Sequence, residues 1–179
     1  MVRFADDFVL MGRKLAEEAM AKLRRVLDRM ELKLNEEKSK QINAKETPFN
    51  FLGFVIRYDK SFKNPKGAKF WNIKPNEKSN RKIRENIKET LKQKGHYKPE
   101  ELVSELNSKV RGWLNNYDIQ GVSYTYMAKR KLNGYMRLSL TRYFNRKSQR
   151  KSRLYRKRAF ELLVTKFGLI DPLKYSPAT

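Results

Sequence analysis

The sequence predicts an α+β protein in which a small region of strands is followed by an all-helical region. Two observations predict this division. At about residue 75 the spacing of apolar residues changes from close to two to close to 3.6. The charge also divides, since residues 1–60 hold 13 Lys/Arg and 10 Asp/Glu, whereas residues 61–179 hold 29 and 9. We therefore expect two domains, residues 1–74 and residues 75–179, with different functions.

The first domain is expected to begin with a β-hairpin. Short apolar stretches at residues 2–4 and 8–10 flank the polar step Ala5-Asp6-Asp7, a pattern typical of a tight turn between strands. Apolar residues at helical spacing then predict an amphipathic helix over residues 15–30. Further strands are expected at residues 32–35, 49–58 and 70–73. A bulge or a close backbone approach is expected at Gly53, and a turn at residues 64–67.

Four helices are expected in the second domain. Ile83, Ile87 and Leu91 share one helical face, and Gly95 is a plausible stop. Pro99 can open a second helix, in which Trp113 lies on the apolar stripe and is expected in the core rather than stacked on bases. After a break at Gly121, helices are expected over residues 123–148 and 152–166.

The net charge of +23 and the pI near 10.2 predict a polyanionic partner. Nucleic acid fits best, because neutralised phosphates release counterions. An anionic membrane surface fits less well, because the basic region is rich in aromatic residues and carries no lipidation motif. No apolar run approaches the roughly 20 residues that span a bilayer. The absence of cysteine is consistent with a reducing compartment, so we expect a cytoplasmic location.

The positive charge is concentrated near the C-terminus. Residues 119–160 hold 13 Lys/Arg and no acid, which disfavours the ordinary interpretation of a solvated charged face. Guanidinium groups bind phosphates bidentately and stack on bases, so this region is expected to contact nucleic acid through its backbone and A-form shape. The candidate residues are Arg137, Arg142, Arg146, Lys147, Arg150, Lys151, Arg153 and Arg156, interleaved with Tyr143, Phe144 and Tyr155.

The adjacent aspartates Asp6 and Asp7 are the most specific indication of catalytic chemistry in the sequence. Adjacent carboxylates repel one another unless a positive group lies near, and a divalent metal is the usual one. In two-metal phosphoryl transfer, carboxylates hold Mg²⁺ ions that activate the attacking hydroxyl and stabilise the leaving oxygen. The alternative is an acidic hairpin turn without catalytic role, since Asp is common at turns.

Four segments, in order, resemble characteristic segments of group II intron-type reverse transcriptases and maturases. Residues 2–10 read VRFADDFVL and resemble the Tyr/Phe-x-Asp-Asp motif, with Ala before the pair. Residues 32–40, LKLNEEKSK, resemble the palm segment whose Lys lies near the incoming triphosphate. Residues 51–54, FLGF, resemble the segment that grips the primer end, and residues 110–117, VRGWLNNY, resemble the Arg-Gly-Trp signature of the thumb, or maturase, domain.

The resemblance implies that residues 1–74 are the C-terminal part of a polymerase palm and residues 75–179 a helical thumb. Asp6 and Asp7 would bind Mg²⁺ for RNA-directed DNA synthesis, and Lys38 would act near the triphosphate. From its own sequence context, Lys38 is equally well interpreted as a solvated lysine beside two glutamates. Gly53 would let a primer strand approach, with a simple bulge as the alternative. Arg111 could reach a phosphate.

A polymerase of this family also needs an upstream palm aspartate and the fingers, which would precede Met1. We therefore expect a two-metal Mg²⁺ site that only an upstream palm-and-fingers polypeptide completes, and no polymerase activity of this chain alone. The expected ligands are intron RNA and template–primer duplex, with DNA as a further candidate. The main alternative is a non-catalytic maturase-like module that binds intron RNA and aids splicing. A basic DNA-binding protein without polymerase ancestry would leave the order of the four segments unexplained.

Overall fold

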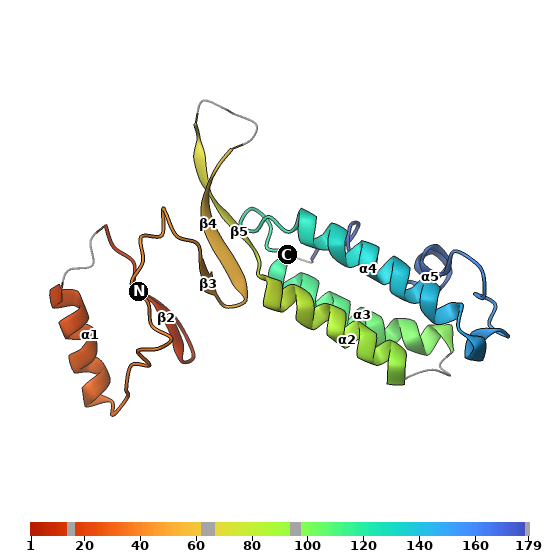
Figure 1. Ribbon diagram of the computed structural model, residues 1–179, viewed down its shortest axis with the longest axis horizontal. Coiled ribbons are helices and arrows are strands. Elements are labelled where there is room, and N and C mark those ends of the chain that lie inside the picture. The colour runs from red at the N-terminus through yellow and green to blue at the C-terminus, as the bar shows by residue number, and fades with distance from the viewer. Residues whose placement is uncertain (14–16, 62–66, 94–97, 178–179) are drawn as a thin grey trace. The chain divides into compact units, whose positions relative to one another are not determined.

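The computed structural model describes residues 1–13, 17–61, 67–93 and 98–177. Short antiparallel strands precede a set of helices, so the expected α+β class is confirmed (Figure 1). The chain forms two compact units, Met1–Thr47 and Pro48–Thr179. They divide earlier than the predicted domains, whose boundary at residues 74 and 75 follows the change from strands to helices.

The first unit begins with the expected hairpin. Strands β1 (Val2–Phe4) and β2 (Asp7–Val9) pair antiparallel, with Phe4 opposite Asp7, around a two-residue turn. Ala5 adopts a φ of 49° in this turn. The expected amphipathic helix is confirmed as α1 (Glu17–Arg29), and none of its residues is buried.

The strand expected at residues 32–35 is wrong. The chain leaves α1 through Glu31, whose φ is 55°, and the Leu32 N–H donates to the Leu27 carbonyl at 2.9 Å. Asn35 then caps a turn, since its side-chain Oδ1 accepts from the Lys38 N–H at 3.1 Å. Among the described residues no strand pairs with this segment, and alternation alone cannot satisfy the backbone of an isolated strand.

The second unit opens with a three-stranded antiparallel sheet in the order β3-β4-β5: β3 is Phe49–Phe51, β4 is Phe54–Lys60 and β5 is Lys69–Pro75. The single strand expected over residues 49–58 is wrong, because the chain reverses at Leu52-Gly53. Both residues have positive φ, 48° and 81°, as a two-residue type I′ turn requires. The strand at residues 70–73 is confirmed. Of the expected turn at 64–67, residues 64–66 lie outside the described part.

Helices α2 (Glu77–Gln93) and α3 (Pro99–Tyr117) are confirmed, with Pro99 in the first turn, while the expected stop at Gly95 falls outside the described residues. Helix α4 (Tyr126–Phe144) and helix α5 (Ala159–Phe167) are shorter than expected. Residues 145–158 form turns and a short 3-10 helix, η1 (Lys147–Gln149), instead of helical ends. Like charges spaced three and four residues apart would repel one another along a helix in this stretch.

The hydrophobic core lies between the helices of the second unit. Its largest fully buried side chains come from α2 to α5 and include Ile87, Leu106, Met136 and Phe160. Trp113 is 7% exposed, so the prediction that it belongs to the core is confirmed. None of the described helices has the length and the apolar character to cross a membrane.

Candidate nucleic-acid interface

The segment between α4 and α5, residues 145–158, is called the basic loop here. It holds eight Lys/Arg and no acid. The described basic side chains of this loop are exposed; that of Lys147 is outside the described set. The structure therefore brings six of the eight residues expected in this region into one short segment: Arg146, Lys147, Arg150, Lys151, Arg153 and Arg156.

The basic loop is anchored to the core rather than hanging from it. Leu154 is only 3% exposed and belongs to the hydrophobic core. Gln149 is buried and donates from Nε2 to the Tyr143 hydroxyl at 3.2 Å. The Arg156 N–H donates to Asn145 Oδ1 at 3.0 Å, which ties the two ends of the loop together. Short turns with buried anchors hold the backbone, while the described cationic side chains stay in water.

Two arginines of the loop lie over aromatic rings. The Arg146 guanidinium is 5.7 Å from the centre of the Tyr143 ring, and that of Arg156 is 5.4 Å from the Tyr155 ring. Burial raises the pKa of the Tyr143 phenol, which the Arg146 charge partly opposes, so the phenol stays neutral at neutral pH. Cation–π contacts restrict the two guanidinium planes before any ligand binds.

Arg137 differs from the described loop arginines, because it pairs with a carboxylate. It pairs with Glu161, donates from Nε to Asn133 Oδ1 at 2.9 Å, and lies 4.5 Å from the centre of the Phe160 ring. These contacts tie α4 to α5. Arg142 is exposed on the last turn of α4, one turn before the loop.

Among the described side chains of the basic loop, ion pairing leaves the positive charge uncompensated. The ion pairs of the described residues are Arg57–Asp59, Arg84–Glu77, Lys109–Glu105, Lys129–Asp118 and Arg137–Glu161. None of them includes a described side chain of the basic loop. A dense positive charge that is not paired with carboxylates in the described part of the chain favours a polyanion.

Arg111 lies elsewhere, in a shallow polar depression of about 450 Å³ on α3. The lining residues are Ser104, Asn107, Ser108, Arg111, Gly112 and Asn115. Asn107 bonds the Gly168 carbonyl at 2.9 Å and the Ile170 N–H at 2.8 Å, so the segment after α5 borders this face. Small side chains around one guanidinium would let a phosphate come close. Sequence reasoning identified Arg111 but not its surroundings.

Gly53 is held against the helices. Its carbonyl accepts from the Asn76 N–H and from Ser79 Oγ, both at 2.9 Å, and the Tyr117 hydroxyl donates to Ser79 Oγ at 2.8 Å. The close approach expected at this glycine is therefore made by two side chains of the same chain. Contact of Gly53 with a primer strand stays a prediction.

Asp6 lies in the turn of the first hairpin, and Asp7 begins β2; both are exposed. Carboxylate oxygens are hard ligands of the type that Mg²⁺ prefers. The pair is therefore chemically suited to supply part of the ligand set of a Mg²⁺ site. Among the described residues, no cluster of three or more His, Cys, Asp or Glu adds a further ligand. Lys38 is exposed in a separate turn, residues 36–38.

Comparison with known protein families gives a match within the second unit. Residues 80–160 match the model of the group II intron, maturase-specific domain. The matched region includes the Arg111-Gly112-Trp113 run, α4 and the whole basic loop, so the resemblance expected from the sequence is confirmed over these residues. The match indicates a function related to group II intron maturation. A search of curated protein sequences found no match.

Proposed function

We propose, from the premise that residues 80–160 match the maturase-specific domain, that this chain binds folded intron RNA and aids splicing. The observation that carries the proposal is the basic loop, with eight Lys/Arg and no acid, anchored on the core of the matched region. Arg142 extends its cationic surface, and the α3 depression around Arg111 offers a further phosphate contact.

The chemistry of the loop suits recognition of RNA shape. Guanidinium groups that are already oriented by Tyr143 and Tyr155 can bind phosphates without losing as much side-chain freedom. An A-form duplex exposes phosphates and 2′-hydroxyls in a shallow minor groove, whereas its major groove is too narrow for side chains to read. Binding should therefore follow the fold of the RNA more than its base sequence.

The test measures the affinity of the full chain for a folded intron RNA as a function of salt. Arg150, Lys151 and Arg153 are changed together to Gln, and Lys22, Arg24 and Arg25 of α1 are changed to Gln as a control with the same loss of charge. Each phosphate contact contributes about 0.9 to the slope of log affinity against log salt. We expect the loop variant to lower the slope by about 2–3 and the control to change it little. Equal effects of the two variants would contradict the proposal.

A second candidate function is Mg²⁺-dependent nucleotidyl transfer, supported by the exposed Asp6-Asp7 pair in a hairpin turn. In this function the carboxylates would hold the metal, which supplies charge stabilisation to phosphoryl transfer, and Lys38 would lie near the triphosphate. An upstream palm-and-fingers polypeptide would complete the site.

Changing Asp6 and Asp7 together to Asn separates the two functions. When the chain is combined with an upstream palm-and-fingers polypeptide, primer extension should be lost in the variant, while binding of intron RNA stays unchanged or becomes slightly tighter. If the wild-type chain binds intron RNA but gives no Mg²⁺-dependent extension in this assay, nucleotidyl transfer is contradicted and only the RNA-binding function is supported.

A further inference from the structure

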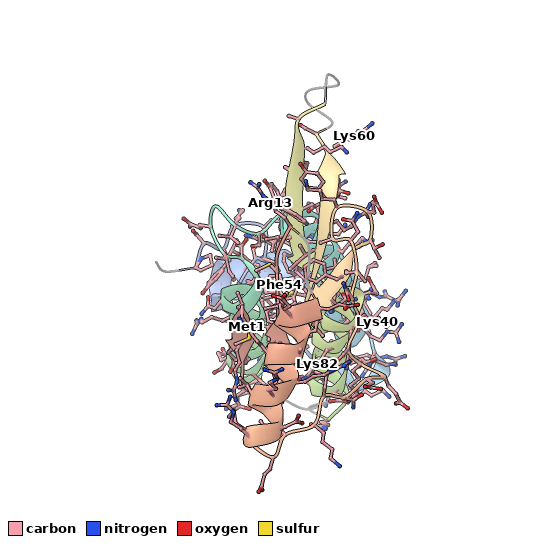
Figure 2. The ribbon with its side chains drawn as sticks, turned by 90° about the vertical axis from the view of Figure 1, so that its left-hand side faces the viewer. Met1, Arg13, Lys40, Phe54, Lys60 and Lys82 are labelled. Atoms are coloured by element: carbon pink, nitrogen blue, oxygen red, sulfur yellow. The ribbon has the colours of Figure 1, made fainter. Side chains whose placement is uncertain are left out.

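We propose that the β4–β5 hairpin carries a separate binding site for an unpaired nucleotide, with the base on Trp71 and the phosphates beside Lys60 and Lys69. The hairpin extends beyond the helices of its unit (Figure 1). Phe54 lies at the end of β4 near the helices and Lys60 at the far end (Figure 2). The site is distinct from the basic loop in both position and chemistry.

The register of the hairpin places aromatic and cationic residues on one face. Tyr58 lies opposite Trp71, and Lys60 lies opposite Lys69, two residues farther along each strand. Since side chains alternate between faces, both pairs share a face. The rings of Tyr58 and Trp71 are 4.9 Å apart at an angle of 44°, and the Lys69 ammonium lies 5.7 Å from the Tyr58 ring.

This face is open and carries no acid. Trp71 is 42% exposed, so much of the largest apolar side chain of this sheet faces water. The one acid of the two strands, Asp59, alternates to the other face, where it pairs with Arg57 at 3.2 Å and accepts from Asn72 at 2.7 Å. The two lysines directly opposite one another repel, which costs the hairpin stability unless an anion lies between them.

An unpaired nucleotide matches both halves of this face. Every base offers a flat π surface that stacks on an exposed aromatic ring. The adjoining phosphates carry negative charge, which would neutralise the two opposed lysines. The two simpler interpretations are a cross-strand aromatic pair that only stabilises the hairpin and an apolar face covered by another protein. Both predict that loss of the Trp71 ring leaves RNA binding unchanged.

The test uses the full chain and a short single-stranded RNA without self-complementarity. The chain has two tryptophans, and Trp113 is buried, so quenching of tryptophan emission by bound bases reports on Trp71. We expect saturable quenching in the wild type. Trp71→Leu should abolish the quenching and weaken single-strand affinity about tenfold, whereas Trp71→Phe should keep most of the affinity.

Tyr126→Leu serves as the matched control, because Tyr126 is an exposed aromatic residue of α4, outside the hairpin, and its loss should change nothing. Circular dichroism would show whether Trp71→Leu perturbs the hairpin. If it does, the double variant Lys60→Gln/Lys69→Gln tests the phosphate contacts of the site instead. It should lower the salt slope for single strands by about 1.4, since each phosphate contact contributes about 0.7.

Equal single-strand affinity of Trp71→Leu, Tyr126→Leu and the wild type would overturn the site, as would wild-type emission that stays constant at saturation. The variant at Arg150, Lys151 and Arg153 separates this inference from the proposed function. If the proposed function of the basic loop fails, this variant keeps its affinity for folded intron RNA. If the hairpin site fails, Trp71→Leu keeps its affinity for the single strand.

Discussion

At Gly53, hydrogen is the only side chain for which the neighbouring helices leave room. A Cβ atom there would lie 2.9 Å from Ser79 Oγ and closer still to the Tyr117 hydroxyl, and the φ of 81° is one that other residues rarely adopt. The sequence could predict a close approach at this glycine. It could not predict the partners, because Ser79 and Tyr117 are brought there by the packing of α2 and α3.

Gly53→Ala should therefore destabilise the second unit by more than the strain of a positive φ, which is roughly 1–3 kcal/mol. Gly121→Ala provides the control, because Gly121 has a similar φ of 72° and no atom near its missing Cβ. The free energy of unfolding in urea gives the comparison. Adding Tyr117→Phe to Gly53→Ala should recover part of the loss by removing the clashing hydroxyl. Equal losses at the two glycines would show that the close approach does not matter.

On the scale of elements, most helices follow from apolar spacing, but the basic loop does not. Its Arg, Lys and Leu residues are good helix formers, so propensity predicts helix up to residue 148 and again from 152. Tertiary packing decides otherwise: Leu154 is drawn into the core, and the turns around it follow from that anchor. A single apolar residue within a charged run gives no periodicity from which this could be predicted.

Leu154→Ala should detach the loop without changing its charge. Loss of a buried leucine costs about 2–5 kcal/mol, so the free energy of unfolding should fall by that amount. Affinity for folded intron RNA should fall as well, because the phosphate-binding groups would no longer be held in place. Leu138→Ala is the control, since Leu138 is 60% exposed on α4 and its truncation should cost less than about 0.5 kcal/mol. Full RNA affinity in a destabilised Leu154→Ala variant would show that the loop binds without its anchor.

On the scale of the whole molecule, the uneven charge indicates two units, but it cannot locate their boundary. The predicted boundary at residues 74 and 75 follows the change in hydrophobic period, which reflects local geometry. The compact units divide at Thr47 and Pro48, because the β3–β4 turn bonds α2 and Phe54 packs edge-on against Tyr117, with 5.0 Å between the ring centres. Such contacts join residues far apart in sequence, and period alone does not report them.

Two truncations distinguish the boundaries. A chain of residues 48–179 keeps the sheet on the helices and should unfold at the same temperature as the second unit of the full chain, with unchanged RNA affinity. A chain of residues 75–179 loses the Gly53 carbonyl and the Phe54 ring, and it uncovers Tyr117 and Ser79. Its thermal midpoint should be lower by several degrees, since each kcal/mol lost shifts the midpoint of a domain this size by about 4–8 °C. If the two truncated chains were equally stable, the strands would belong to the first domain, as the hydrophobic period predicts.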